Sequence, residues 1–301
     1  MSEKELSGIV IVKKEEGITS QSVVNRIKKI YGVKKAGHTG TLDPMASGVL
    51  PVLIGRAVKA SDFLLTKDKH YVATILLGTT TDSEDITGNV ISKSENIPSE
   101  ESVYEAVNSM LGVSLQTPPM YSAIKMGGRK LCDLAREGKT VDRNPREICI
   151  FKIKARKINE LEYELYVHCS KGTYIRTLCK DIGEKLSCGA CMKALCRTKA
   201  SSYTLDDAKT IGEIEKMNDV QRESLVRKTE EIFVSFKKIT LSPFFSRLAR
   251  CGQPIYTKKI GASVEVGERV TFYDENGFFA LGEASVLDGQ NVIKPIRQFD
   301  V

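Results

Sequence analysis

A glycine-rich loop at residues 37–50 constrains this chain more than any other part of its sequence. The loop reads Gly-His-Thr-Gly-Thr-Leu-Asp-Pro-Met-Ala-Ser-Gly-Val-Leu and joins a helix-like segment to an apolar run. Its three glycines permit close approaches that larger residues resist, and Pro44 fixes the backbone directly after Asp43. Such a loop can hold one carboxylate in a defined pose beside a ligand. The alternative is an ordinary surface loop whose aspartate caps a helix.

Three segments have the patterns of strands. Residues 8–12 form a short apolar run that is typical of a buried strand. Residues 71–77 are largely apolar on both faces, which predicts a central strand covered on both sides. Residues 163–168 alternate between apolar and polar side chains and predict a half-exposed strand.

Helix patterns lie between these strands. Thr19 or Ser20 can cap a helix whose apolar residues recur at helical spacing and which Gly32 can end. A second helix is expected after Pro98. Thr173 can cap a third, with Ile175, Leu178, Cys179, Ile182 and Leu186 as its buried stripe. Strands and helices mixed in this order predict an α+β domain.

The pattern changes towards the end of the chain. Residues 210–236 are charged and helical in tendency, and we interpret them as a connection to a second domain. Short strands follow, including a hairpin with 269–273 and 278–284 on either side of an Asp-Glu-Asn-Gly turn. We therefore predict one domain over 1–236 and a small β-rich domain over 237–301. Residues 118–146, rich in Gly, Pro, Lys and Arg, are expected to form an excursion from the first domain.

Composition places few limits on the function. The 301 residues carry a net charge of +7, which permits a polyanionic partner without requiring one. The polar N-terminus lacks the apolar core of a signal peptide, and no apolar run is long enough to span a membrane. We expect a cytoplasmic protein that contacts no membrane.

Eight cysteines raise the question of metal binding. Cys188 and Cys191 form a Cys-x-x-Cys step, with Cys179 and Cys196 nearby. Structural zinc usually needs two paired ligand steps. Here there is a single step, and His168 has no histidine near it in the sequence. We therefore expect buried, reduced thiols rather than zinc ligands or disulfides.

The loop also resembles a known motif. The string GHTGTLDPMASGVLPVLIGRAVK is similar to the catalytic motif of the TruB family, the bacterial tRNA pseudouridine-55 synthases. Other blocks resemble the family in the same order: GIVIVKKEEGITSQSVVNRIKK, KHYVATILLGTTTDSEDITGNV, PPMYSAIKMGGRKLCDLAREG, SKGTYIRTLCKDIGEKL and CGACMKALCRTKAS. The resemblance implies a mixed, mainly antiparallel sheet with flanking helices. It also implies that 118–146 is an RNA-binding thumb and that the C-terminal domain is PUA-like.

The resemblance implies three catalytic residues. Asp43 would be the nucleophile, and Arg176 would pair with it and keep it ionised. From the pattern alone, Arg176 is either a solvated surface residue or the partner of an anion. Tyr71 would place its ring against the target base with its hydroxyl near the C5 proton. From alternation alone, Tyr71 reads as a core aromatic.

The resemblance also implies contacts to the RNA. His38 would help to fill the space left by the flipped nucleotide, Lys69 belongs to the same motif as Tyr71, and Leu195 would form a wall of the pocket. The thumb residues that we assign to substrate binding are Lys125, Arg129 and Lys130. A solvated charged loop is the alternative for the thumb, because acidic residues dilute its charge.

The expected function is isomerisation of uridine to pseudouridine at position 55 in the T-loop of tRNA. The expected enzyme is a monomer that binds the T arm of tRNA and uses no cofactor and no metal. One alternative is a guide-RNA-dependent rRNA pseudouridine synthase. The others are a non-catalytic tRNA-binding or folding factor and a zinc-dependent RNA-binding protein.

Overall fold

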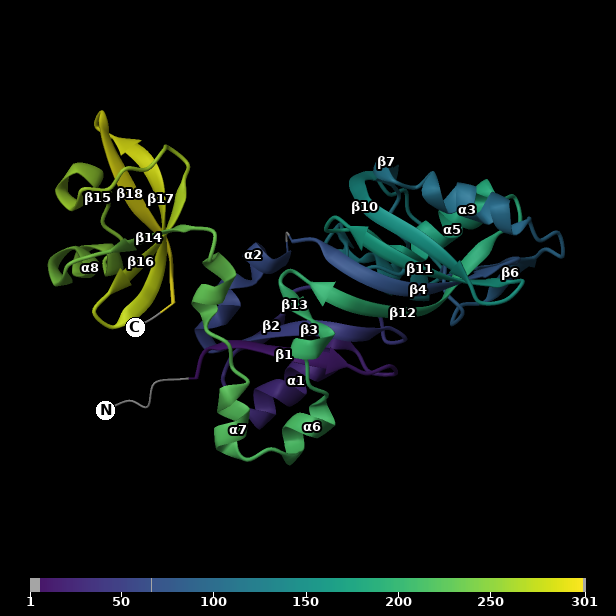
Figure 1. Cartoon of the computed structure of the whole chain (residues 1–301), viewed down its shortest axis with the longest axis horizontal. Coiled ribbons are helices and arrows are strands. Elements are labelled where there is room, and N and C mark those ends of the chain that lie inside the picture. The colour runs from purple at the N-terminus through teal and green to yellow at the C-terminus, as the bar shows by residue number, and fades with distance from the viewer. Residues whose placement is uncertain (1–5, 66, 300–301) are drawn as a thin grey trace.

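Two β-sheets, one of nine strands and one of five, form the body of the structure, and two short strand pairs lie outside them. It is a computed structural model that describes residues 6–65 and 67–299. In Figure 1 the large sheet and its helices occupy the centre and right of an elongated molecule, and the small sheet lies at the left end. Both sheets are accompanied by helices, so the α+β class is confirmed.

The large sheet has nine strands and is mixed but mainly antiparallel, as the sequence predicts. Its main path is β1-β3-β12-β4-β11-β10-β7, with β2 beside β3 and β13 beside β12. Only the β12–β3 pair is parallel among the described strands of this sheet. The strands are β1 (Gly8–Lys14), β2 (Ala36–His38), β3 (Ser47–Ile54), β4 (Lys69–Leu77), β7 (Gly112–Gln116), β10 (Arg146–Lys157), β11 (Glu162–Cys169), β12 (Ala190–Ala200) and β13 (Tyr203–Thr204).

Helices cover one face of the central strands. Tyr71, Ala73, Ile75 and Leu77 of β4 share a hydrophobic core with side chains of α3 (Glu100–Asn108) and α5 (Ile175–Lys185). The helix α1 (Ser20–Ile30) packs on β1 and β3 in a second core. The remaining elements of this region are α2 (Ser61–Leu65), the 3-10 helix Gly55–Ala60 and the short pair β5 (Thr79–Thr81) and β6 (Val90–Lys93).

Strand β4 is central but is not covered on both sides, so that part of the prediction is wrong. Its alternate residues from Lys69 to Leu77 are buried, whereas those from His70 to Leu76 are only half-buried. Apolar residues such as Val72 and Leu76 therefore lie on the more open face. The sequence pattern is ambiguous here because an apolar side chain can lie on a partly solvated sheet face.

The two predicted helix caps differ in outcome. Thr19 caps α1, because its side chain accepts a hydrogen bond from the Ser22 amide. Thr173 does not cap α5. The N-cap is Tyr174, and the Thr173 hydroxyl donates instead to the Ser170 carbonyl at 3.0 Å. The hydroxyl thus stabilises the turn before the helix rather than its first free amides.

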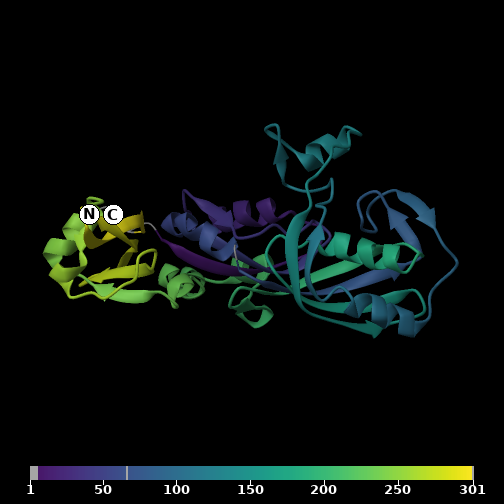
Figure 2. The same ribbon diagram turned by 90° about the horizontal axis from the view of Figure 1, so that it is seen from above.

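The predicted excursion projects from the body of the molecule in Figure 2. It carries a two-stranded hairpin, β8 (Lys125–Met126) and β9 (Arg129–Lys130), followed by the short helix α4 (Leu131–Arg136). Leu131 and Leu134 are the buried residues of this helix. We call residues 118–146 the thumb.

The segment 210–236 contains α6 (Ile211–Lys216), α7 (Asp219–Ser224) and the 3-10 helix Thr229–Phe233, and a shorter 3-10 helix, Leu205–Asp207, precedes it. It is helical as predicted, and it also packs on the first region. Ile211 and Ile214 are buried in the same core as α1.

The small sheet has the order β14-β16-β17-β18-β15. The predicted hairpin is confirmed, since β16 and β17 pair in antiparallel fashion around the turn. The elements are β14 (Lys237–Thr240), α8 (Pro243–Arg250), β15 (Ile255–Tyr256), the 3-10 helix Thr257–Ile260, β16 (Arg269–Asp274), β17 (Gly277–Leu287) and β18 (Gln290–Gln298). No helix in the described part of the chain is long and apolar enough to cross a membrane.

Candidate active site

A cleft of about 1070 Å³ lies between the Asp43 loop, the covered face of β4, the start of α5 and the base of the thumb. Asp43, Tyr71 and Arg176 all line it, although 133 positions separate Asp43 from Arg176 in the sequence. The fold therefore brings the three predicted catalytic residues together.

Arg176 is the fixed partner of Asp43. Its Nε lies 2.9 Å from Asp43 Oδ2 and its Nη2 lies 3.3 Å from Oδ1, which is a two-point contact. The guanidinium also donates to the carbonyls of Ser83 at 3.1 Å and Tyr121 at 2.8 Å. Only 5% of the Arg176 side chain is exposed, which contradicts the solvated-surface alternative. A planar guanidinium held from several sides fixes the carboxylate in one orientation.

Burial and charge act in opposite directions on Asp43. Burial raises the pKa of its carboxyl above the usual value, and the cation of Arg176 opposes that rise. Asp85 adds a second carboxylate, 3.6 Å from Arg176, and it raises the Asp43 pKa further. The net direction of the Asp43 pKa is upwards, so the ionised carboxylate is less stabilised in this cleft than in water.

Lys14 supports the loop, a role that the sequence analysis did not assign. Its side chain is fully buried at the end of β1, and Nζ donates to the carbonyl of Ala46 at 2.5 Å and that of Pro44 at 3.2 Å. Burial lowers the pKa of Lys14 to about 8. The cation anchors the backbone on the C-terminal side of Asp43. The sequence feature that could have indicated this role is a lysine at the end of a largely apolar strand.

Arg197 holds the loop from the other side and was also missed. It is 1% exposed, and it donates through Nε to the Val49 carbonyl at 2.8 Å and through Nη2 to the Gly40 carbonyl at 3.1 Å. Gly48 permits the backbone of β12 to approach the loop closely at Arg197. Its φ is +114°, and an added Cβ would lie 2.2 Å from the Arg197 carbonyl oxygen. A larger residue at this position would force the loop away from β12.

Tyr71 faces the cleft from β4 and is 9% exposed. Burial raises the pKa of its phenol, while Arg197, which shares a hydrogen bond with it, lowers the pKa. The net direction is upwards, so the group is a protonated phenol at neutral pH. Tyr71 is therefore both a buried core aromatic and a residue that lines the cleft.

The other predicted pocket residues also reach the cleft. His38, Lys69 and Leu195 are among its lining side chains. Lys69 donates to the carbonyls of Leu65 at 3.1 Å and Lys67 at 2.5 Å, and burial lowers its pKa to about 8. These bonds turn its charge towards the backbone at the edge of the cleft.

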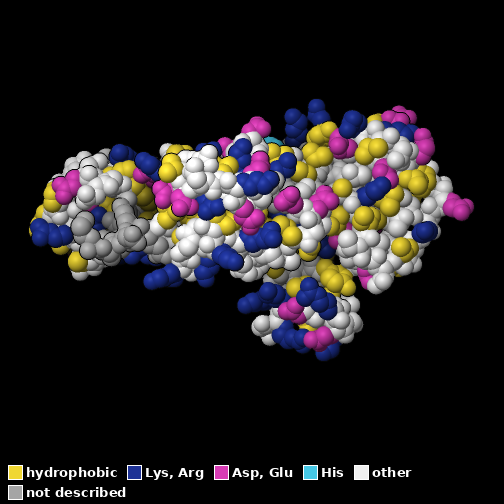
Figure 3. All heavy atoms as spheres, turned by 90° about the horizontal axis from the view of Figure 1, so that it is seen from below, with side chains coloured by type: hydrophobic (Ala, Val, Ile, Leu, Met, Phe, Trp, Pro, Cys, Tyr) yellow, Lys and Arg dark blue, Asp and Glu magenta, His cyan; other side chains and the backbone are white. Residues whose placement is uncertain are grey.

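The thumb residues divide into two groups. All three side chains are exposed, but Lys130 also lines the cleft, whereas Lys125 and Arg129 do not. Arg129 forms an ion pair with Glu137, which also binds Lys139 at 3.0 Å. Figure 3 shows Lys and Arg side chains over the protruding thumb with acidic side chains among them.

Comparison with known proteins identifies the family. A model described as "TruB family pseudouridylate synthase (N terminal domain)" matches residues 28–175. A second, described as "tRNA pseudouridylate synthase B C-terminal domain", matches residues 176–236. The chain belongs to the TruB family. It is therefore a pseudouridine synthase, an isomerase that acts on uridine in RNA. The small sheet lies beyond both matches, and the predicted division after residue 236 stays a prediction.

Relatives within the TruB family match almost the whole chain. A tRNA pseudouridine synthase B of Clostridium tetani is 39% identical over 291 residues, which is 96% of this chain and 99% of the relative. One of Alkaliphilus oremlandii is 40% identical over 295 residues, covering 97% and 98%. A solved H/ACA ribonucleoprotein with a substrate RNA containing 2′-deoxyuridine has a TM-score of 0.72 at 22% identity, covering 98% of this chain and 85% of that one. That likeness shows the shared fold alone.

Proposed function

We propose that this enzyme converts uridine to pseudouridine at position 55 in the T-loop of tRNA, with Asp43 as the nucleophile. The observation that carries the proposal is the two-point contact between Asp43 and the buried Arg176 in the cleft. The names of the near full-length relatives, tRNA pseudouridine synthase B, support tRNA as the substrate.

The reaction requires the N1–C1′ bond of the uridine to break and a C5–C1′ bond to form. The base loses the proton on C5 and gains one on N1, so no redox partner and no group donor is needed. A carboxylate can bind the sugar or the base covalently while the base turns, as carboxylates do in retaining glycosidases. Asp43, oriented by Arg176, is suited to that role.

Tyr71 is the candidate for moving the C5 proton. Tyr71 lines the same cleft as Asp43. Burial raises the pKa of its phenol, and the Arg197 guanidinium opposes that rise and would stabilise the phenolate that proton removal requires. The ring would stack against the base. His38, Lys69 and Leu195 would enclose the flipped nucleotide, whose extrusion costs a few kcal/mol.

The thumb and the small C-terminal domain would supply contacts to the T arm. We propose that Lys125, Arg129 and Lys130 bind phosphates when the thumb closes on the RNA. We also propose that the β-rich domain at 237–301 is PUA-like and binds RNA, and that the enzyme acts in the cytoplasm as a monomer. A guide-RNA-dependent activity is the weaker candidate, because the H/ACA likeness lies below 25% identity.

Incubation of the purified enzyme with an unmodified tRNA transcript, followed by mapping of pseudouridine, tests the proposal. We expect modification of position 55 without added protein or guide RNA, and also in an isolated T-arm stem-loop. A transcript with cytidine at position 55 is the matched control and should remain unmodified. Modification that requires a guide RNA, or that falls at another position, would overturn the proposal.

A further inference from the structure

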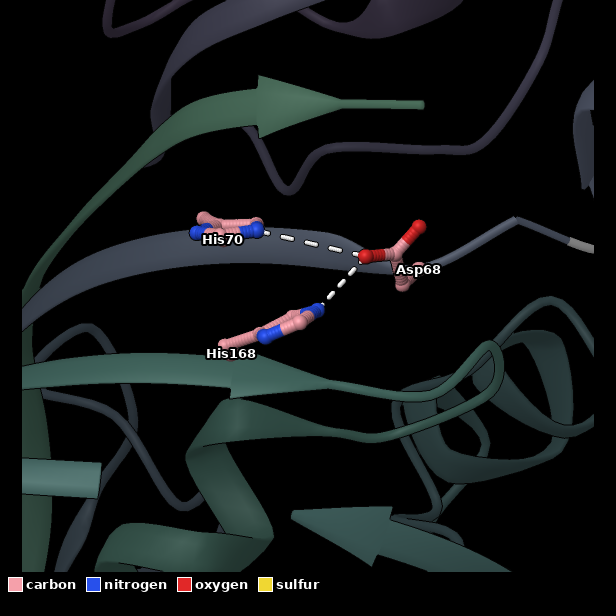
Figure 4. A group of neighbouring side chains, drawn as sticks. All are labelled: Asp68, His70 and His168. Atoms are coloured by element: carbon pink, nitrogen blue, oxygen red, sulfur yellow. Dashed lines mark hydrogen bonds and ion pairs between the residues drawn. The ribbon is translucent and has the colours of Figure 1, made fainter. Parts of the chain in front are cut away.

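Two histidines and an aspartate meet on the more open face of the large sheet. His70 of β4 pairs directly with His168 of β11 in the antiparallel register. Their rings stack with centroids 4.0 Å apart and planes at 19°. Both Nε2 atoms point at Asp68, with distances to Oδ2 of 3.9 Å from His70 and 2.5 Å from His168 (Figure 4). His168 therefore has a histidine neighbour in space that it lacks in the sequence.

The geometry of these three side chains is that of a chelating set. Their ligand atoms all lie within 4.8 Å of one another. Adjacent positions on neighbouring antiparallel strands place two side chains on the same face, with Cβ atoms about 4.5–5.5 Å apart. Two imidazoles in such positions can bind one ion through Nε2, with the carboxylate as a third ligand.

The set is open to solvent. The side chains of Asp68, His70 and His168 are 39%, 36% and 28% exposed. Beside them lies a hollow of about 320 Å³ that His70 and His168 help to line, together with Lys152 and Lys154. An ion can enter from this hollow, and water can fill the remaining coordination positions.

We propose that Asp68, His70 and His168 bind one divalent transition-metal ion of the cobalt, nickel, copper and zinc class. Imidazole nitrogen selects these ions over Ca²⁺ and Mg²⁺, which take oxygen ligands. The site departs from the sequence expectation of a metal-free chain, which weighed the cysteines and His168 but not the pairing of His168 with His70 across two strands. The lysines that line the hollow, Lys152 and Lys154, repel cations and weaken the binding.

The proposed ion would join β4 to β11 without entering the reaction. His70 follows Lys69 and precedes Tyr71, but its side chain lies on the face opposite to the cleft because alternate strand residues point to opposite faces. The ion would therefore fix the register of the strand that carries Tyr71. The uridine chemistry proposed above needs no metal and stands or falls separately.

Titration of the full-length, tag-free protein with Co²⁺ and Ni²⁺ tests the site. We expect one ion per chain by calorimetry, and a Co²⁺ absorption spectrum of nitrogen and oxygen ligands without a thiolate charge-transfer band. His70→Asn and His168→Asn should each weaken binding at least tenfold, because each removes one ligand. His38→Asn is the matched control, since His38 is the third histidine of the chain, and it should bind as tightly as the parent.

A second readout is thermal unfolding, because an ion that binds only the folded state raises the unfolding temperature. Ni²⁺ should raise it in the parent and in His38→Asn but not in His168→Asn, and a chelator should reverse the rise. Circular dichroism without metal shows that each variant folds, and Asp68→Asn replaces any variant that does not. Three results would overturn the proposal: no saturable binding by the parent, a thiolate charge-transfer band, or binding by His70→Asn and His168→Asn that is as tight as binding by the parent.

Discussion

At the scale of single residues, the active site is organised around one carboxylate. Arg176 orients Asp43 from the side of α5, while Lys14 and Arg197 bind the carbonyl oxygens of its loop. Three buried cations thus surround the loop that carries Asp43, the proposed nucleophile. Each cation makes several hydrogen bonds, as buried charges must if they are to be stable.

The first prediction concerns Asp43. Asp43→Asn keeps the size of the side chain but removes the nucleophile, so single-turnover formation of pseudouridine should fall by several orders of magnitude. The tRNA dissociation constant should change little, because affinity comes mainly from backbone and stacking contacts. Asp206→Asn makes the same chemical change at an exposed position and should keep the parent rate. Substantial turnover by Asp43→Asn would remove Asp43 from the role of nucleophile.

Tyr71 carries the second prediction. Tyr71→Phe keeps the ring and its packing, so the protein should fold and bind tRNA with little change in affinity. It loses the hydroxyl beside Arg197. A general base is typically worth about 10²–10⁴ in rate, and we expect a fall of that order in the single-turnover rate. A variant that reacts at nearly the parent rate would make Tyr71 a wall of the pocket only.

At the scale of elements, α5 carries both Arg176 and a partly buried acid, Asp181. Asp181 is partly buried on this helix, and burial raises its pKa from 3.8 to about 6. Between those two values the folded state binds more protons than the unfolded state. The free energy of unfolding therefore falls as pH rises through this window.

Asp181→Asn should remove that pH dependence. The variant should unfold at a higher temperature than the parent at pH 8, where the parent carries a desolvated carboxylate. The difference should shrink as the pH approaches 4, where the parent carboxyl is protonated. Thermal unfolding followed by circular dichroism at several pH values measures this, with Asp206→Asn as the control. Equal unfolding temperatures of variant and parent at pH 8 would contradict the shifted pKa.

The thumb is the element expected to close on RNA. Each phosphate contact contributes about one unit to the slope of log affinity against log salt concentration. Replacing Arg129 and Lys130 by alanine should lower that slope by less than two, because Arg129 is already paired with Glu137. Filter binding of tRNA at several salt concentrations measures it. Lys154→Ala, on the opposite sheet face, is the control, and an unchanged slope in the thumb variant would favour the solvated-loop alternative.

The sequence predicted those features that depend on local pattern or family motif. The Asp43 loop, the helix cap at Thr19 and the strand alternation of 163–168 all depend on residues close together in the chain. The roles of Lys14 and Arg197 could not be predicted, because a cation within a strand or at its end is usually solvated. The contact of His70 with His168 depends on the pairing register of β4 with β11, and no local pattern specifies that register.

At the scale of the whole molecule, a small aromatic cluster joins the two sheets. Phe233 lies in the segment between them and is 1% exposed. Its ring contacts Phe63 at 5.0 Å, from the first region, and Phe278 and Phe299 at 5.8 and 5.7 Å, from the second. Edge and tilted contacts of this kind add to the burial of the rings.

The last prediction is that this cluster couples the unfolding of the two regions. Phe233→Ala should cost about 3–5 kcal/mol, as is typical for a buried phenylalanine. Because each sheet keeps its own core, the lost free energy should come mainly from the contact between the two regions. Calorimetry should then separate one unfolding transition into two. Phe244→Ala, which removes a ring that is 58% exposed, should leave the parent profile unchanged. A single, merely shifted transition in Phe233→Ala would show that the sheets unfold together by other contacts.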